Sequence, residues 1–514
     1  MNSTIRTAII ISIRTLLTIK VSHKLLIFTL FITLFSLQSC KEPENQNLPN
    51  VVFIMADDMG YGDLKCLNPE SGVNTPNMDR IAEEGMIFTD AHSPSAVCTP
   101  TRYGVLTGRY CFRTSLKSGV LVGHSPSLIE TERFTVAELL ISAGYHTACI
   151  GKWHLGLDWT RIDTSKPLIT GSIWNRPNTE NLDYTANVSE GPTDHGFDFS
   201  FIIPASLDMT PYCYISNKKL IAPITDTTPG LNNPRGVFWR PGDIQEGFTV
   251  EGVLPRITAE ATKYIKSRSG SGQPFFLFFP LTAPHTPWLP LEEFQGSSEA
   301  GIYGDFVAQV DWTVGQVLKS LDENGFSENT LVILTSDNGS HWTPSDKKLF
   351  SHRANAGFSG MKSDAWEGGH HVPFLVRWSA RVKAGSTNNE ITSLTDLFAT
   401  LADITGQIIP DNAAEDSYSM LPAILGENVE PIREGTIHHS ISGMFALRQG
   451  KWKFIDGRGS GGWSYAGNNN EPAGQLYDME LDPKETTNLY LENPDQVSKM
   501  KNLLEQYKSS GRSR

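Results

Sequence analysis

The sequence predicts an α/β protein with a large, mixed but mostly parallel sheet flanked by helices, followed by a small C-terminal α+β subdomain. Three observations support this fold class. Short, continuous apolar runs recur along the chain, helical patterns lie between them, and the pattern changes near Ile437 to short strands and one last helix. Apolar runs without alternation are typical of strands buried on both faces, and strands that alternate with helices favour a parallel sheet.

Four of these apolar runs predict the central strands. They cover residues 50–55, 146–150, 274–281 and 331–335. Polar, ionisable residues follow each run at once: Asp57-Asp58, Lys152 and His154, His285, and Asp337-Asn338. Because ligands of open α/β sheets bind beyond the carboxyl ends of the strands, we expect these side chains to form one site.

Helices are predicted over residues 77–84, 135–143 and 303–321. Thr75-Pro76 provides a cap and an N-terminal proline for the first, while Gly85 and Gly144 end the first two. The third carries an apolar stripe at helical spacing, which indicates core packing and no functional role.

Residues 157–243 show weak periodicity and many Asn, Pro, Gly and Thr residues, so we expect long loops that contact substrate. Residues 444–455 predict a hairpin centred on Gln449-Gly450, residues 475–479 a strand and residues 494–507 a closing helix. We therefore assign residues 50–435 to the catalytic domain and residues 436–514 to the subdomain.

The N-terminus predicts export. Residues 1–39 contain four basic and no acidic residues and end in an apolar run too short to span a bilayer. The following Cys40, in Leu37-Gln38-Ser39-Cys40, resembles the lipidated cysteine of bacterial lipoproteins, with residues 40–49 as a tether. We expect a lipid anchor at the outer membrane, facing the periplasm or the exterior; the alternative is an ordinary cleavable signal peptide.

Composition limits the partners. Without residues 1–39 the chain has 39 basic against 56 acidic residues, a net formal charge of −17. Because nucleic acids and anionic membrane surfaces require basic patches, we expect neither as a partner, and contact with a membrane only through the lipid. Setting Cys40 aside leaves five cysteines, an odd number for an exported protein, so one thiol is chemically special.

The acidic and amide side chains at the strand ends indicate a metal site. Asp57 and Asp58 repel each other unless a cation compensates, and Asp337-Asn338-Gly339 adds two oxygen ligands beside a turn. Oxygen ligands without a set of His and Cys favour Ca²⁺ or Mg²⁺ over zinc. Each pair alone could equally be a cap or a turn.

Basic side chains at the other strand ends suit the transfer of an anionic ester group. Lys152 and His154 alternate on an extended segment, so both can project from one face. With His285 and Lys362 they provide two acid/base groups and two cations for an oxyanion. These residues do not separate a sulfate ester from a phosphate ester.

Ordered motifs resolve this choice by resemblance. Cys98-Thr99-Pro100-Thr101-Arg102 matches the C-x-P-x-R signature of type I, formylglycine-dependent sulfatases, and residues 151–156 (GKWHLG) resemble their second signature. Further matches run from about residue 50 to 489, including residues 57–60, 75–79, 106–109, 336–339 and 366–369. The family's fold, that of the alkaline phosphatase superfamily, agrees with the α/β prediction.

The resemblance implies a nucleophile and a metal. Cys98 would be oxidised after synthesis to formylglycine by a formylglycine-generating maturation enzyme, and the hydrated aldehyde would supply the nucleophilic hydroxyl. One Ca²⁺ ion would be held by Asp57, Asp58, Asp337, Asn338 and the modified Cys98.

It also implies the remaining catalytic roles. Arg102 and Lys152 would stabilise the hydrate and bind sulfate, while His285 and Lys362 would face the bridging oxygen. His285 would protonate the leaving alcohol, and His154 would take a proton from the sulfated intermediate to expel sulfate.

We therefore predict an exported sulfatase that acts on a sulfated polysaccharide or its oligosaccharides, such as ulvan, carrageenan or a glycosaminoglycan. His195, Asp208 and His341 are candidate sugar contacts, and Trp239, Trp288, Trp342 and Trp366 are candidate stacking platforms. A phosphate or phosphonate monoester hydrolase and a non-catalytic glycan-binding relative are the alternatives. The sequence leaves the oligomeric state and the pairing of Cys66, Cys111, Cys149 and Cys213 open.

Overall fold

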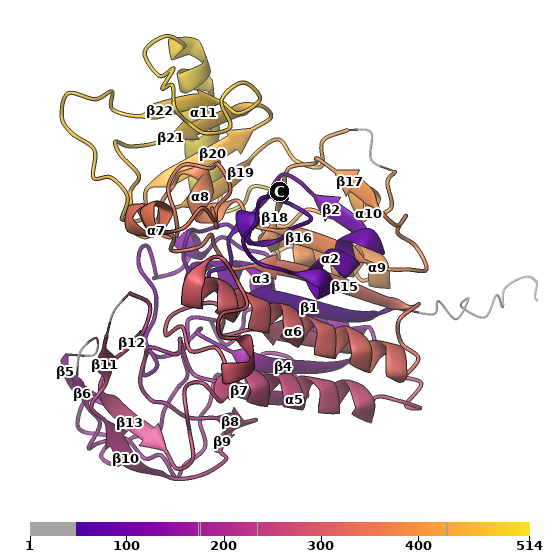
Figure 1. Ribbon diagram of the computed structural model, residues 1–514, viewed down its shortest axis with the longest axis vertical. Coiled ribbons are helices and arrows are strands. Elements are labelled where there is room, and N and C mark those ends of the chain that lie inside the picture. The colour runs from indigo at the N-terminus through magenta and orange to yellow at the C-terminus, as the bar shows by residue number, and fades with distance from the viewer. Residues whose placement is uncertain (1–47, 173, 175, 234, 428–429) are drawn as a thin grey trace, which may run out of the picture. The chain divides into compact units, whose positions relative to one another are not determined.

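The chain folds around a ten-stranded mixed sheet whose centre is parallel, as the computed structural model shows (Figure 1). The strand order is β17-β2-β16-β15-β1-β14-β4-β7-β8-β9. The five central strands run parallel to one another: β15 (Thr330–Ser336), β1 (Asn50–Ala56), β14 (Phe275–Pro280), β4 (His146–Lys152) and β7 (Phe199–Ile203). The structure describes residues 48–514 except 173, 175, 234 and 428–429, so the predicted signal, Cys40 and most of the tether lie outside it.

Both edges of the sheet are mixed. On one side lie β16 (Phe374–Arg377), β2 (Met86–Phe88) and β17 (Ser386–Asn388); on the other lie β8 (Ile215–Ser216) and β9 (Lys219–Leu220). The strands β16 and β8 pair antiparallel with the parallel centre. The predicted fold class, a mixed and mostly parallel sheet flanked by helices, is confirmed.

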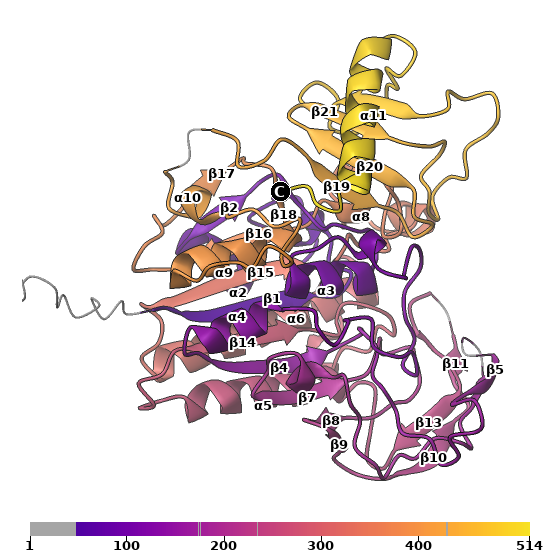
Figure 2. The ribbon, with the colours of Figure 1, turned by 180° about the vertical axis from the view of Figure 1, so that it is seen from behind.

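Helices cover both faces of the sheet. The helices α2 (Pro76–Glu83), α5 (Val253–Ser267) and α6 (Gly301–Glu323) lie on the face seen in Figure 1. The helices α3 (Cys98–Thr107), α4 (Val136–Ser142) and α9 (Leu397–Thr405) lie on the face seen from behind in Figure 2. The helix α4 begins where predicted because Thr135 and Glu138 form a capping box. Short helices α7 (Pro344–Leu349), α8 (Glu367–His370) and α10 (Leu421–Ile424) occur in the connections.

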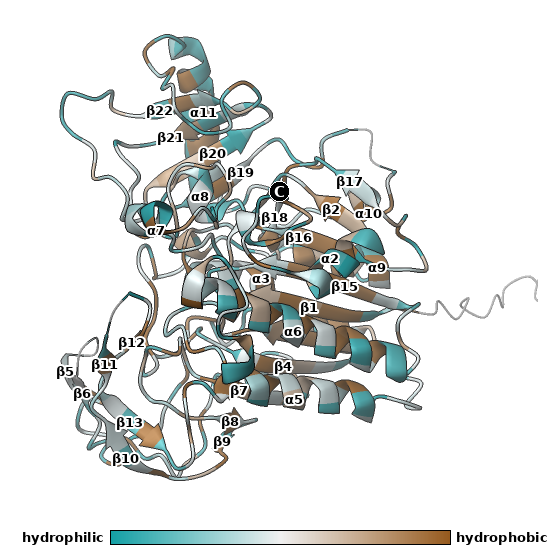
Figure 3. Ribbon diagram, in the orientation of Figure 1, coloured by the Kyte–Doolittle hydropathy of each residue, from teal (hydrophilic) through white to brown (hydrophobic). Residues whose placement is uncertain are grey.

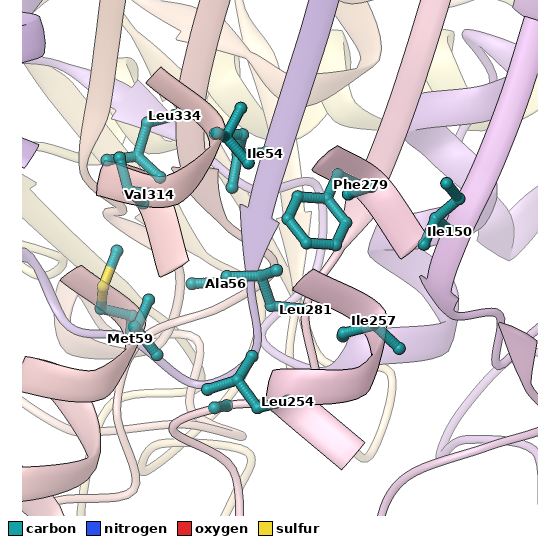
Figure 4. Packing of buried hydrophobic residues seen from close by; sticks show 14 of the residues in the cluster. Ile54, Ala56, Met59, Ile150, Leu254, Ile257, Phe279, Leu281, Val314 and Leu334 are labelled. Carbon is teal, nitrogen blue, oxygen red and sulfur yellow. The ribbon is translucent and has the colours of Figure 1, made fainter. Parts of the chain in front are cut away.

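One large core lies between the sheet and the helices of Figure 1. The central strands are mostly brown in Figure 3, whereas α5 and α6 are apolar toward the sheet and polar outside. Figure 4 shows Ile54, Phe279 and Leu334 of neighbouring strands pointing toward this helical layer. Because these strands are buried on both faces, they carry apolar residues without alternation, which is the pattern the sequence displays.

The prediction of loops over residues 157–243 was wrong in one important part. The strand β7 lies in this region, reads FSFII and joins the main sheet beside β4. The rest forms small antiparallel pairs: β5 (Thr170–Ser172) with β6 (Arg176–Asn178), β10 (Ile224–Thr228) with β13 (Gly242–Gln245), and β11 (Leu231–Asn232) with β12 (Phe238–Trp239). Their sequences are short and polar, so pairing with each other decides their strand conformation.

The C-terminal segment forms a separate antiparallel sheet of β19 (Thr436–His439), β20 (Phe445–Gln449), β21 (Trp452–Ile455) and β22 (Gln475–Asp478). The helix α11 (Pro494–Ser509) packs on β20 and β21 through its apolar face. Residues Pro49–Arg514 nevertheless form one compact unit. A short parallel pair, β3 (Ala91–His92) with β18 (Thr392–Ser393), lies outside both sheets. Among the residues that the structure describes, no helix is long and apolar enough to cross a membrane.

Candidate active site and metal centre

The structure brings the polar residues at the ends of the parallel strands together at one edge of the main sheet. Asp57 and Asp58 follow β1, Asp337 and Asn338 follow β15, and Lys152 ends β4. The side chains are buried, and a direct contact reaches across β14: the Lys152 Nζ lies 2.6 Å from Asp57 Oδ2. The strand topology therefore builds the site that the sequence predicted at this edge.

Cys98 reaches this site from α3, on the face of the sheet opposite α5 and α6 (Figure 2). It is the first residue of α3, where Pro100 is tolerated because it lies in the first turn. Its side chain is buried, and burial raises the pKa of its thiol to about 11. Since a thiolate is the reactive form of cysteine, the unmodified thiol is a poor nucleophile at neutral pH.

Arg102 lies one helical turn after Cys98, on the same side of α3. Its Nη2 lies 2.7 Å and its Nε 3.1 Å from Asp337 Oδ2, and its Nη1 donates to the Lys152 carbonyl at 2.8 Å. The Arg102 guanidinium is wholly buried, so these bonds hold it rigidly between β15 and β4.

Two lysines hold the paired aspartates. Lys152 contacts Asp57, and Lys362 Nζ lies 2.7 Å from Asp58 Oδ1 and 2.8 Å from Oδ2. Burial alone would raise the pKa of both carboxyl groups, but Lys152 lowers that of Asp57 and Lys362 lowers that of Asp58. Asp58 also has a left-handed backbone with φ of 67°, a strained conformation of the kind that clusters at functional sites. Both carboxylates are thus kept ionised in the protein interior.

The carboxylate and amide oxygens fit a hard cation. Asp57 Oδ1 and Asn338 Oδ1 are buried and have no hydrogen-bond partner among the described residues. Ligand atoms of Asp57, Asp58, Cys98 and His285 all lie within 4.8 Å of one another. Burial, together with repulsion from Asp57, raises the pKa of Asp337 to about 7. An oxygen-rich site with unpaired buried oxygens suits Ca²⁺ or Mg²⁺.

The two histidines present different nitrogens to the site. The Nδ1–H of His285 donates to the Thr286 carbonyl at 2.6 Å, which leaves Nε2 facing Asp58 Oδ2 at 3.8 Å. The Nε2–H of His154 donates to the Leu121 carbonyl at 2.8 Å, and its Nδ1 has no partner among the described residues. Burial, together with the charges of Lys152 and Arg102, lowers the pKa of His154 well below its ordinary value. His154 is therefore a neutral base with an available nitrogen.

The predicted extended segment that carries Lys152 and His154 ends before His154. Lys152 is the last residue of β4, whereas His154 has a left-handed backbone with φ of 55°. Strand alternation therefore does not reach His154, although both side chains are buried. The sequence has no glycine at position 154 that would signal this conformation.

Sequence reasoning also missed Thr99. Its hydroxyl donates to the His154 carbonyl at 3.0 Å and accepts from the Leu121 N–H at 3.2 Å. Thr99, the residue after Cys98, thus contacts both His154 and Leu121, which are themselves joined by the hydrogen bond of the His154 ring. Its place within the Cys98–Arg102 signature was the only signal available.

The three candidate sugar contacts have different surroundings. His341 packs against Trp463 with ring centroids 5.0 Å apart, and burial and the Arg235 and Lys362 charges lower its pKa to about 4. Asp208 pairs with Arg240 in a loop beyond β7. His195 instead precedes β7, at the opposite edge of the sheet, and its carbonyl accepts from the Thr135 hydroxyl at the start of α4. The structure does not bring His195 to the site.

Two of the predicted stacking platforms belong to the core. Trp288 and Trp342 are buried, and both pack against Tyr303 in the core between the sheet and the helices of Figure 1. Trp239 and Trp366 are half-buried and donate from Nε1 to Thr228 and Gln475. All five cysteines that the structure describes are free, so no disulfide occurs among the described residues; they are Cys66, Cys98, Cys111, Cys149 and Cys213.

The fold and site define a hydrolase of anionic esters, with a buried cationic cradle beside an oxygen-lined metal site. The comparisons give the family. The sulfatase family model matches residues 49–407, and one described as N-sulphoglucosamine sulphohydrolase, C-terminal, matches residues 362–510. The chain belongs to the sulfatase family and hydrolyses sulfate esters.

Three relatives illustrate the similarity. The N-acetylgalactosamine-6-O-sulfatase of Bacteroides thetaiotaomicron is 32% identical, covering 91% of this chain and 94% of that protein. Human arylsulfatase A is 32% identical, covering 86% of this chain and 83% of that protein. A solved sulfatase structure, described under the metabolism of multiple glycosaminoglycans by Bacteroides thetaiotaomicron, has a TM-score of 0.78 and 30% identity; the match covers 90% of this chain and all of that one.

Proposed function

We propose that the protein removes sulfate from a sulfated carbohydrate, using a formylglycine made from Cys98 and one Ca²⁺ ion. One observation carries the proposal: Cys98, a buried thiol of raised pKa, lies within 4.8 Å of oxygens of Asp57 and Asp58 and of a His285 nitrogen. A cysteine inside an anion-binding, metal-binding cradle has no use as a thiol, whereas the hydrated aldehyde of formylglycine supplies a hydroxyl nucleophile at that position.

The cations of the site would hold the sulfate. Arg102 donates to the Lys152 carbonyl, and Lys362 contacts Asp58, which lies in the same cluster as Cys98. All three are buried, so each exerts its charge in a medium of low polarity and needs little reorganisation as charge develops on the sulfate oxygens. This arrangement also answers how an acidic protein attracts an anionic substrate, because the attraction is local.

The hydrogen bonds of the histidines support two proton transfers. His285 has its Nδ1–H fixed on the Thr286 carbonyl, so only Nε2 can give a proton to the leaving alcohol oxygen. His154 has its Nε2–H fixed on the Leu121 carbonyl, so only Nδ1 can accept a proton from the nucleophilic centre. Each ring thus has one nitrogen for positioning and one for chemistry.

The metal would be held by Asp57, Asp58, Asp337 and Asn338 beside the modified Cys98. When bound, Ca²⁺ supplies positive charge that orients the sulfate and stabilises its developing negative charge. Arg102 and Lys152 then need not neutralise all three carboxylates, and their donors become available to the substrate.

For the carbohydrate, we propose a glycosaminoglycan fragment with 6-O-sulfated N-acetylgalactosamine. The support is the full-length similarity to the Bacteroides 6-O-sulfatase and the 0.78 TM-score to the glycosaminoglycan-related structure. The test is sulfate release from 6-O-sulfated N-acetylgalactosamine, its 4-O-sulfated isomer and 6-O-sulfated N-acetylglucosamine, with oligosaccharides of ulvan and carrageenan alongside. Turnover of the first at least tenfold above the others supports the assignment; a preference for an algal oligosaccharide overturns it.

The same experiment separates sulfate from phosphate chemistry. An aryl sulfate and the matching aryl phosphate are compared at equal concentration, with the Arg102→Ala variant as the control for turnover outside the site. A sulfate preference is expected, and a strong preference for the phosphate would contradict the proposal. No turnover of these aryl esters or of the sulfated sugars, with formylglycine present, would indicate a glycan-binding protein.

We also propose that the protein is exported and anchored by lipid on Cys40, facing the periplasm or the exterior. The support is the sequence of residues 1–40 alone. Metabolic labelling with palmitate, followed by membrane fractionation, tests it. Label on the intact chain that disappears in Cys40→Ala is the expected result, and equal label in both would exclude Cys40.

A further inference from the structure

A second cluster of ionisable side chains lies outside the active site, where the main sheet meets the C-terminal sheet. Its centre is three histidines from distant segments: His92 ends β3, His370 ends α8 and His438 lies in β19. All three side chains are completely buried. Three buried imidazoles need a physical reason, since burial favours apolar side chains in their place.

One nitrogen of each ring lies within hydrogen-bond distance of an oxygen acceptor. His92 Nε2 lies 2.6 Å from Asp90 Oδ1 and His370 Nε2 lies 3.2 Å from the Ala365 carbonyl. His438 Nδ1 lies 3.1 Å from the Ser93 carbonyl. A ligating histidine typically donates its other N–H to a carboxylate or a backbone carbonyl, so these are the partners that would orient metal ligands.

Two of the remaining nitrogens lie close together. His92 Nδ1 and His370 Nδ1 are 3.1 Å apart, and His438 Nε2 is buried without a hydrogen-bond partner among the described residues. One ligand atom from each ring lies within 4.8 Å of the other two. Burial lowers the pKa of all three histidines, so they are neutral, which is the form that binds a metal.

From these contacts we propose that His92 Nδ1, His370 Nδ1 and His438 Nε2 bind a divalent transition metal, Zn²⁺ above all. Imidazole ligands suit zinc and its neighbours, whereas the oxygens of the active site suit Ca²⁺ or Mg²⁺. The two sites of this chain thus select different ions. The zinc site ties β19 of the C-terminal sheet to the segment that leads from β3 to Cys98.

Two further features bear on this site. The rings of His370 and His438 are parallel with centroids 4.0 Å apart, so one ring tilts when both nitrogens point at a shared ion. Lys453 Nζ lies 2.9 Å from His370 Nε2 and can only donate, so metal binding by His370 Nδ1 requires Lys453 to leave this nitrogen and keep Glu367 at 2.9 Å and Glu485 at 2.7 Å. A surface hollow is lined by Asp90, which contacts His92, and by Glu367 and His371.

The same geometry permits a metal-free arrangement, which the experiment must distinguish. Lys453 can donate to His370 Nε2, His370 Nδ1–H to His92 Nδ1, and His92 Nε2–H to Asp90. That chain of hydrogen bonds satisfies two of the three rings. It leaves His438 Nε2 unpaired, which is the observation that favours the metal.

The test is zinc binding by the full chain, stripped of metals and then saturated with Ca²⁺ so that the active site does not take up zinc. Elemental analysis after equilibration with Zn²⁺ should give one equivalent per chain, and X-ray absorption should show three nitrogen ligands at about 2.0–2.1 Å. No bound zinc, or an oxygen-only shell, would overturn the proposal. Neither readout depends on sulfatase turnover.

Matched variants locate the ion. His438→Asn keeps a donor to the Ser93 carbonyl and removes Nε2, and His92→Gln keeps a donor to Asp90 and removes Nδ1. Since outer-shell changes alone cost roughly 10–100-fold in metal affinity, each variant should lose at least about 100-fold. His439→Asn, at the buried neighbour on β19 that lies outside the cluster, should bind zinc normally. Unchanged zinc affinity in both ligand variants would place the ion elsewhere and refute the assignment.

Discussion

His154 Nε2 donates a 2.8 Å hydrogen bond to the carbonyl oxygen of Leu121. A carbonyl can only accept, so this bond fixes the neutral tautomer of His154 with its proton on Nε2 and its lone pair on Nδ1. The His154 Nδ1 is buried beside Lys152 and Arg102, which oppose its protonation. The tautomer, and not the presence of a histidine alone, makes this residue a base.

His154→Gln should remove the base and keep the hydrogen bond, because its side-chain amide can still donate to the Leu121 carbonyl. We expect kcat to fall by roughly 10²–10⁴ with little change in KM. Steady-state kinetics on an aryl sulfate measure this split. In the wild type the lowered pKa of His154 predicts that kcat does not decline near pH 6.5 but only at distinctly lower pH. A decline centred at pH 6.5 or above, or an unchanged kcat in the variant, would contradict the role.

Thr99→Val should weaken catalysis without removing a catalytic group. The change keeps the shape of the side chain but deprives the Leu121 N–H and the His154 carbonyl of their partner. Because small misplacements of catalytic groups are costly, kcat should fall roughly 10- to 100-fold, and the acid limb of its pH profile should move.

The control for Thr99 is Thr101→Val on the same helix. The Thr101 hydroxyl is buried as well and donates to the Ser95 carbonyl at 3.0 Å, away from His154. Its kcat should stay within a few-fold of the wild type. Equal losses in both variants would mean that packing of α3, and not the position of His154, explains the effect.

Much of the architecture follows from local pattern. The runs at β1 and β15 predict both the strands and the carboxylates after them, since strand ends of a parallel sheet share one edge. The roles of His154 and Thr99 could not be predicted from local pattern, because each depends on a hydrogen bond to a distant carbonyl. His154 donates to Leu121, 33 residues away, and Thr99 donates to His154, 55 residues away. His195 fails for the same reason, since it precedes a strand whose presence was not predicted.

The histidine cluster shows a further limit of sequence reasoning. His92 and His370 are 278 residues apart, and neither lies in a motif with metal-ligand spacing. The rings come together only because β3, α8 and β19 lie close to one another in the fold. Sequence spacing predicts a metal site when the ligands lie on one element, whereas each of these three histidines lies on a different element.

Cys98 should be formylglycine in protein produced in its native host. Mass spectrometry of the peptide that contains Cys98 should show the aldehyde or its hydrate, and an active preparation with wholly unmodified thiol would refute the proposal. Cys98→Ala should lose nearly all turnover and keep its fold by circular dichroism. The control Cys213→Ala, also at a buried free cysteine, should retain turnover even where its stability falls.

Removal of Ca²⁺ should abolish turnover and lower Tm. Without the ion, only the basic side chains of the site compensate the buried carboxylates of Asp57, Asp58 and Asp337. Activity should return with added Ca²⁺. Asn338→Ala removes an unpaired oxygen of the cradle, so half-maximal activity should need at least about tenfold more Ca²⁺. Asn68→Ala, which loses only a hydrogen bond to the Gly62 carbonyl, serves as the control and should keep the wild-type requirement. An Asn338 variant with an unchanged Ca²⁺ requirement would exclude it as a ligand.

His124 should make the protein less stable in acid. Burial lowers the pKa of its imidazole to about 4, from about 6.5 in the unfolded chain. The imidazole of His124 therefore binds a proton near pH 6.5 in the unfolded state but only near pH 4 in the folded state. Stability from this group is complete above pH 6.5 and is lost as the pH falls through this window, by about 2 kcal/mol between pH 7 and pH 5.

The variant His124→Gln removes this pH dependence, because glutamine does not titrate. Its amide can still form the hydrogen bond to the Tyr184 hydroxyl, which lies 3.2 Å from His124 Nε2. Free energies of unfolding from denaturant melts at pH 7 and pH 5, in Ca²⁺, give the difference between the two proteins at each pH. The variant should lose about 2 kcal/mol less than the wild type over this interval, whatever its stability at pH 7. Parallel losses in both proteins would show that His124 titrates normally in the fold, and that its burial against Trp159 and Tyr184 does not hold it neutral.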